Sequence, residues 1–69
     1  MEDRFKITGE YIEMNKLLKA SGLCDTGGMA KAVIEDGLVE VDGSVEMRVR
    51  RKIRPGQKVA FQGHVIHVK

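Results

Sequence analysis

The chain has 69 residues, of which 42% are hydrophobic and 32% are charged. So short a chain holds one domain with a small core, and the composition is typical of a folded globule rather than a disordered tail. No apolar run approaches the roughly 20 residues of a membrane span, and the N-terminus lacks a signal peptide's apolar region. The single cysteine, Cys24, excludes an internal disulfide and a compact cysteine-rich zinc site. We therefore expect one cytoplasmic domain over residues 1–69, with no cofactor, no metal and no membrane partner.

Charge is unevenly distributed along the chain, although the net charge is only +2. Residues 1–46 contain all 10 acidic residues and carry a net charge of −5, whereas residues 47–69 contain seven basic residues and no acidic one. A basic segment of this density attracts polyanions. We favour nucleic-acid contact over the alternative that the segment is only a solvated strand face. Its central basic residues are Arg48, Arg50, Arg51, Lys52, Arg54 and Lys58.

The first half of the chain predicts a short strand at residues 5–8, followed by two helices. A helical apolar stripe places the first helix at residues 10–21, and a second stripe places the next at residues 26–36. A glycine follows each helix, as is common at helix C-termini. Asp25 or Thr26 would be the N-cap of the second helix. The buried face of that helix would consist of Met29, Ala30, Val33 and Ile34.

The second half predicts strands at residues 38–41, 44–47, 58–62 and 64–68. Asp42-Gly43 and Gln62-Gly63 are signals for two-residue hairpin turns. The fold class is α+β, with two adjacent helices packed on one face of a small, mainly antiparallel sheet. We expect a core that contains Leu18, Val33, Ile34, Val39 and Val41.

An ordered set of motifs resembles the ribosomal S-four type of RNA-binding domain, also called the αL motif. Residues 30–43 resemble the family's second helix, its terminating glycine and its V-x-V-[N/D]-G hairpin. Residues 53–59 are similar to the turn and strand that follow, and residues 14–18 are similar to the first helix. The similarity covers residues 12–61. The compact form and the Arg-rich segment particularly resemble the small stand-alone YbcJ-like proteins of bacteria.

The resemblance implies a non-catalytic domain that binds structured RNA, such as ribosomal or transfer RNA. Many family members carry arginines that commonly face RNA where this chain has Glu13 and Gly27. Lys31 lies at a matching basic position, and Lys16 lies on the first predicted helix. The departures imply an RNA footprint that is moved toward the Arg-rich segment. DNA is left open as an alternative partner, and we expect a monomer.

Alternating polar and apolar residues suggest how the Arg-rich segment would bind. If residues 46–54 form one extended strand, alternate side chains share a face at a spacing of roughly 6.6 Å. Such a row of cations can follow a phosphate backbone without reading bases. Arg51 would point to the other face, where a structural ion pair and an RNA contact are equally compatible with the pattern. The predicted RNA-binding residues are Lys16, Lys31, Arg48, Arg50, Arg51, Lys52 and Arg54.

Several other residues carry weaker signals. Tyr11 is the aromatic residue best placed to stack on a base, but packing beside the first helix is an equally good interpretation. Cys24 is better interpreted as a small, partly buried thiol than as a reactive one. His64 and His67 are three residues apart in a predicted strand, so they should lie on opposite faces and share no metal ion.

Two competing functions remain at this stage. One is a protein-interaction module, in which the basic segment docks on an acidic partner and the resemblance reflects the fold alone. The other is a very small enzyme, which we rank last because no nucleophile–base pair, metal cluster or phosphate-loop motif is present.

Overall fold

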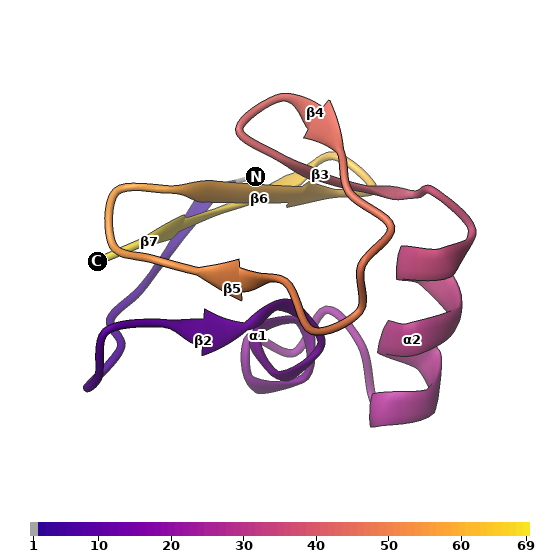
Figure 1. Cartoon of the computed structure of the whole chain (residues 1–69), viewed down its shortest axis with the longest axis horizontal. Helices are drawn as coiled ribbons and strands as arrows, with labels where there is room; N and C mark the ends of the chain where they lie inside the picture. Colours follow the sequence, from indigo (N-terminus) through magenta and orange to yellow (C-terminus); the bar gives the residue numbers. More distant parts are fainter. Residues whose placement is uncertain (1) are drawn as a thin grey trace.

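The computed structural model describes residues 2–69, which form seven strands and two helices. The strands are β1 (Glu2–Phe5), β2 (Ile12–Glu13), β3 (Val39–Val41), β4 (Ser44–Val45), β5 (Lys52–Ile53), β6 (Lys58–Phe61) and β7 (His64–Val68), and the helices are α1 (Met14–Ala20) and α2 (Gly27–Glu35). Five strands form one sheet in the order β1-β7-β6-β3-β4, while β2 and β5 form a separate two-stranded ribbon. Both helices and the ribbon lie on the same side of the sheet (Figure 1).

Strand pairing makes the sheet mainly antiparallel, because only β1 and β7 pair in parallel. The predicted α+β class, with two helices on one face of such a sheet, is confirmed. The first strand was predicted at residues 5–8 but lies at Glu2–Phe5. It is an edge strand with mostly exposed side chains, so no apolar pattern marks its position. No helix within residues 2–69 is long and apolar enough to cross a membrane.

Local signals set the ends of both helices. The Thr26 side chain caps α2, since its Oγ1 accepts a hydrogen bond of 3.1 Å from the backbone N–H of Met29. Gly37 follows α2 with a φ of 76°, which glycine adopts without steric cost. Helix α1 begins at Met14 rather than near residue 10, because Ile12–Glu13 pair with β5 as a strand.

Both predicted hairpin turns are confirmed. Asp42 and Gly43 have φ values of 51° and 88°, and Gln62 and Gly63 have φ values of 50° and 80°. Two consecutive residues with positive φ match the turn whose twist suits a two-residue hairpin. These turns fix the registers of β3 with β4 and of β6 with β7.

The core lies between the sheet and the two helices. Four of the five predicted core residues are buried, and the fifth, Val33, is half-buried against them. Met29 was predicted to be buried but is 40% exposed. The buried face of α2 is centred on Ala30 and Ile34, and Met29 lies about 100° around the helix from Ala30. The buried residues are Met14, Leu17, Leu18, Cys24, Ala30, Ile34, Val39, Val41, Ile53, Val59, Phe61, Ile66 and Val68.

Candidate nucleic-acid interface

The Arg-rich segment is a loop for most of its length, so the predicted continuous strand over residues 46–54 is wrong. Only Lys52–Ile53 forms a strand, and it pairs with β2 rather than with the main sheet. A regular row of cations spaced along one strand face therefore does not exist. Val45 and Met47, on either side of Glu46, are 58% and 57% exposed.

The loop has this shape because its backbone carbonyl groups accept hydrogen bonds from the first N–H groups of α1. The N–H of Met14 donates to the carbonyl oxygen of Arg51 at 2.8 Å, and the N–H of Asn15 donates to that of Val49 at 3.1 Å. The first N–H groups of a helix have no partner inside it, so these two bonds satisfy donors that would otherwise be unpaired. The loop then turns sharply, since the N–H of Arg51 donates to the carbonyl oxygen of Arg48 at 3.2 Å.

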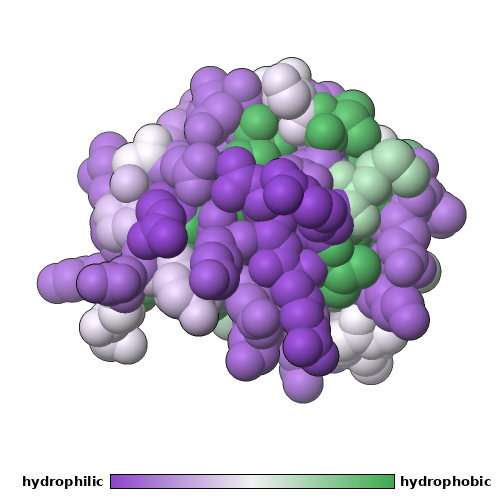
Figure 2. Space-filling view, viewed as in Figure 1, coloured by the Kyte–Doolittle hydropathy of each residue, from purple (hydrophilic) through white to green (hydrophobic). Residues whose placement is uncertain are grey.

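This turn brings together the basic side chains that were predicted to form a row along one strand face. A shallow hollow of about 490 Å³ is lined by Arg48, Arg50, Arg51, Lys52 and Arg54, which we call the basic surface. Figure 2 shows the most strongly hydrophilic side chains gathered across the centre of this face, over β5 and the loop before it. All five strand-segment residues predicted to bind RNA therefore lie together, although in a different geometry.

Glu46 organises one part of the basic surface. Its carboxylate accepts hydrogen bonds from Arg48 Nε at 3.0 Å and Nη2 at 2.8 Å, and from Arg51 Nε at 3.0 Å. It also accepts one from the backbone N–H of Arg48 at 3.1 Å. Arg51 is fixed further, because its Nη1 donates to the carbonyl oxygen of Lys52 at 2.8 Å. One carboxylate thus holds two guanidinium groups side by side.

These contacts also change the pKa values of Glu46 and Arg48. Hydrogen bonds from Arg48 are the main cause that lowers the pKa of Glu46 to about 2, and the charge of Arg48 and a hydrogen bond from Arg51 act in the same direction. The hydrogen bonds to Glu46, together with its negative charge, raise the pKa of Arg48. Glu46 is therefore ionised at neutral pH, and it offsets one positive charge of the basic surface.

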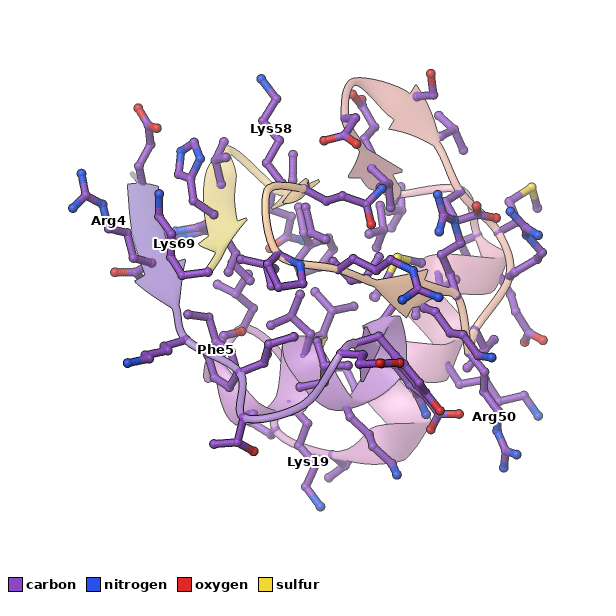
Figure 3. The ribbon with its side chains drawn as sticks, turned by 60° about the vertical axis from the view of Figure 1, so that its left-hand side comes forward. Arg4, Phe5, Lys19, Arg50, Lys58 and Lys69 are labelled. Atoms are coloured by element: carbon purple, nitrogen blue, oxygen red, sulfur yellow. The ribbon has the colours of Figure 1, made fainter. Side chains whose placement is uncertain are left out.

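The other cations of the basic surface are held less tightly. Arg50 projects outward at one side of the molecule, whereas Arg4 and Lys69 lie at the opposite side (Figure 3). Lys52 and Arg54 lie over the ring of Tyr11, with Lys52 Nζ 4.9 Å and Arg54 Cζ 5.9 Å from the ring centroid. No local pattern indicated that Tyr11 would meet these cations, because their contact depends on the pairing of β2 with β5.

The two predicted lysines on the helices do not line the hollow. Lys16 of α1 forms an ion pair with Glu13 of β2, with Nζ 3.4 Å from Oε1. Lys31 is exposed on α2. Sequence reasoning also missed the role of Glu46, whose signal was its position as the last acidic residue before the basic segment.

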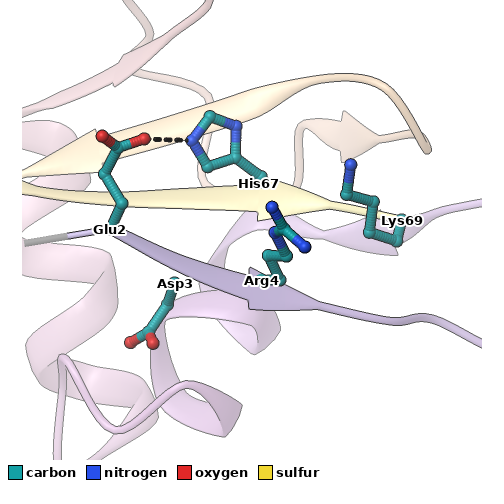
Figure 4. Close-up of a pocket in the computed structure, with 5 residues that line it drawn as sticks. All are labelled: Glu2, Asp3, Arg4, His67 and Lys69. Carbon is teal, nitrogen blue, oxygen red and sulfur yellow. Dashed lines mark hydrogen bonds and ion pairs between the residues drawn. The ribbon is translucent and has the colours of Figure 1, made fainter.

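A second hollow of about 450 Å³ lies at the β1 edge of the sheet, but its charge is mixed. Two carboxylates and two cations line it with His67, whose Nε2 lies 2.6 Å from Glu2 Oε1. Figure 4 shows this contact, and shows Asp3 pointing to the other side of β1 from Glu2. The nearby carboxylates make this edge less suited to a polyanion than the basic surface.

The remaining candidate residues have structural positions. Cys24 is buried, and burial raises the pKa of its thiol, which agrees with its interpretation as a packed rather than a reactive cysteine. His64 and His67 lie three residues apart on β7, hence on opposite faces. Within residues 2–69, no three His, Cys, Asp or Glu side chains are arranged to hold a metal ion.

Comparison with known proteins extends these observations. The S4 domain family model matches residues 5–69. YbcJ of Escherichia coli K12 is 47% identical over 58 residues, which cover 84% of this chain and 83% of YbcJ, and YbcJ of Shigella flexneri gives the same values. The solution structure of E. coli YbcJ, described as revealing an αL motif involved in RNA-binding, matches with a TM-score of 0.73 and 42% identity over 94% of this chain and 84% of that one. The chain therefore belongs to the S4 domain family, and its fold is that of YbcJ.

Proposed function

We propose that this protein binds structured RNA through the basic surface, without catalysing a reaction. The observation that carries the proposal is that five cations line one hollow, and that Glu46 pairs with two of them, Arg48 and Arg51. Membership of the S4 domain family supports a binding role rather than an enzymatic one. The solution structure of YbcJ, which has the same fold, is described as revealing an αL motif involved in RNA-binding. This likeness supports RNA over other polyanions as the ligand.

The basic surface suits phosphate groups in two ways. A guanidinium group has five N–H donors, and Glu46 uses only two of those of Arg48, so the others can donate to phosphate oxygens. Because Glu46 already orients Arg48 and Arg51, less side-chain freedom is lost when RNA binds. Arg50 and Arg54 supply positive charge that can adapt to the backbone they meet.

Folded RNAs such as ribosomal or transfer RNA fit this surface, because their helices are recognised mainly by shape, phosphates and 2′-hydroxyls. Lys31 and Lys16 would assist from the helices, although Lys16 must first leave Glu13. We propose that the protein acts as a monomer in the cytoplasm, where a free thiol such as Cys24 persists.

Salt dependence tests the proposal directly. Five cations less the one offset by Glu46 leave about four to neutralise phosphates, so the slope of log K against log salt should be about −3 to −4 for a folded ribosomal RNA fragment. Replacing Arg50 and Arg54 with alanine should flatten that slope by about 1.5 to 2 units. Exposed charges contribute little to stability, so the variant should remain folded.

A charge-matched control is available at the opposite side of the molecule. The Arg4→Ala/Lys69→Ala variant loses the same net charge but leaves the basic surface intact. If both double variants change the slope equally, the contact is not localised and the basic surface is not the binding site. Duplex DNA of equal length and an acidic protein serve as competitors. Saturable binding of the acidic protein that excess folded RNA does not displace would favour the protein-interaction alternative.

A further inference from the structure

We propose that Tyr11, Lys52 and Arg54 form a subsite for one unpaired RNA nucleotide at the edge of the basic surface. The base would replace the two cations over the Tyr11 ring and stack there, and its phosphate would bind the cations that it displaces. The inference rests on the proposed function and deepens it, because a surface that follows phosphates alone does not distinguish a paired from an unpaired nucleotide.

The β2–β5 ribbon brings these three side chains together. Ile12 pairs with Ile53 and Glu13 with Lys52, so the next position in this antiparallel register places Tyr11 opposite Arg54. Ile53 points into the core and is fully buried. Alternation along the ribbon therefore puts the neighbours of the two isoleucines on the outer face. Tyr11 is 42% exposed there.

Tyr11 also borders a hollow of its own. This hollow, of about 310 Å³, is lined by Phe5, Lys6, Ile7, Thr8, Gly9, Tyr11 and Ile12. Its volume is at the lower end for small-molecule sites, which suits one base rather than several. Phe5, Ile7 and Ile12 are half-buried against the core and provide a firm apolar wall. Figure 3 shows Phe5, the last residue of β1, turned inward.

The charges of Lys52 and Arg54 are available to a phosphate group. Neither Lys52 Nζ nor the Arg54 guanidinium lies in an ion pair among residues 2–69, because Glu13 on the same face pairs with Lys16. Their contact with the ring is a cation–π interaction at an exposed site, which contributes little to folding. A nucleotide offers both partners at once, a flat base for the ring and a phosphate for the cations.

The test uses two RNA hairpins that differ by one base. One carries a single bulged adenosine, and the other carries an abasic nucleotide at that position, so the phosphates are identical. Wild-type protein should bind the adenosine hairpin more tightly by a factor of about 5 to 150, the range for stacking one base on an aromatic ring. Tyr11→Phe should retain this preference because it keeps the ring, whereas Tyr11→Leu should lose it.

Tyrosine fluorescence gives an independent reading of the same event. The chain contains one tyrosine and no tryptophan, so its emission reports on Tyr11 alone. The adenosine hairpin should quench this emission more strongly than the abasic hairpin when both are saturating.

Equal affinity of the wild type for the two hairpins would overturn the subsite, as would an undiminished preference in folded Tyr11→Leu. The wild-type comparison needs no variant, so it decides even if Tyr11→Leu is unstable. In either case the proposed function would stand if the wild type binds RNA in a salt-dependent way and Arg50→Ala/Arg54→Ala weakens that binding. If the wild type binds neither hairpin, the proposed function itself fails.

Discussion

Glu46 accepts four hydrogen bonds, three from Arg48 and one from Arg51, and thereby decides which cations of the basic surface are fixed. Alternation had placed Glu46 and Arg48 on one strand face and Arg51 on the other. The sharp turn of the loop brings all three together instead. The two interpretations of Arg51, a structural ion pair and a phosphate contact, are compatible in this geometry because its Nη2 is not used by Glu46 or Lys52.

Glu46 should also make stability depend on pH. Its pKa is lowered in the folded protein from an ordinary 4.5 to about 2, so its stabilising effect is present above about pH 4.5 and is lost as the pH falls toward 2. Glu46→Gln removes this effect. The difference in unfolding free energy between the wild type and Glu46→Gln should therefore be largest above pH 5 and should shrink toward pH 2. Urea unfolding across this pH range measures it.

Glu35→Gln is the matched control, because it makes the same change at an exposed position on α2. A difference between wild type and Glu46→Gln that stays constant from pH 7 to pH 2 would contradict the role assigned to the Glu46 carboxylate.

At the scale of elements, short-range signals located most of the secondary structure. The Thr26 cap, the glycines after the helices and the two hairpin turns are local features, and each is present in the structure. The β2–β5 ribbon was not predicted, because each of its strands has two residues and no alternation of its own. The ribbon also shortened α1, since residues that continued the helical stripe are used for strand pairing.

The Gln62-Gly63 turn leads to a prediction about hairpin stability. Gln62 has a φ of 50°, a conformation that asparagine tolerates better than glutamine. Gln62→Asn should stabilise the protein by about 0.5–1 kcal/mol, a fraction of the cost of this conformation for an ordinary residue. Thermal unfolding should show an increase in Tm of about 2–8 °C. Gln62→Val should lower Tm instead, and equal melting of the two variants would contradict the argument.

At the scale of the whole molecule, one core joins both helices to the sheet, and little reserve is available in a chain of 69 residues. Ile34 is fully buried on α2, whereas the adjacent Val33 is half-buried at the edge of the same core. The two positions therefore form a matched pair for testing where the core lies.

Ile34→Ala should lower the unfolding free energy by about 2–5 kcal/mol, because it leaves a cavity between α2 and the sheet. Val33→Ala should cost about 1 kcal/mol, since its side chain is only partly removed from water. Urea unfolding with circular dichroism distinguishes the two. Equal losses would show that Val33 and Ile34 are buried to the same extent.

The sequence alone determined the fold class, both helices, the two hairpins, most of the core and the identity of the basic residues. These depend on periodicity, caps and turn residues, whose effects act over a few positions. Only the tertiary structure decided how the basic residues are arranged. The carbonyl groups of the loop at residues 46–51 accept hydrogen bonds from N–H groups of α1 that have no partner inside the helix. Tyr11 meets Lys52 and Arg54 because two segments about 40 residues apart pair as strands. Such contacts join positions that are distant in the chain, so no local pattern records them.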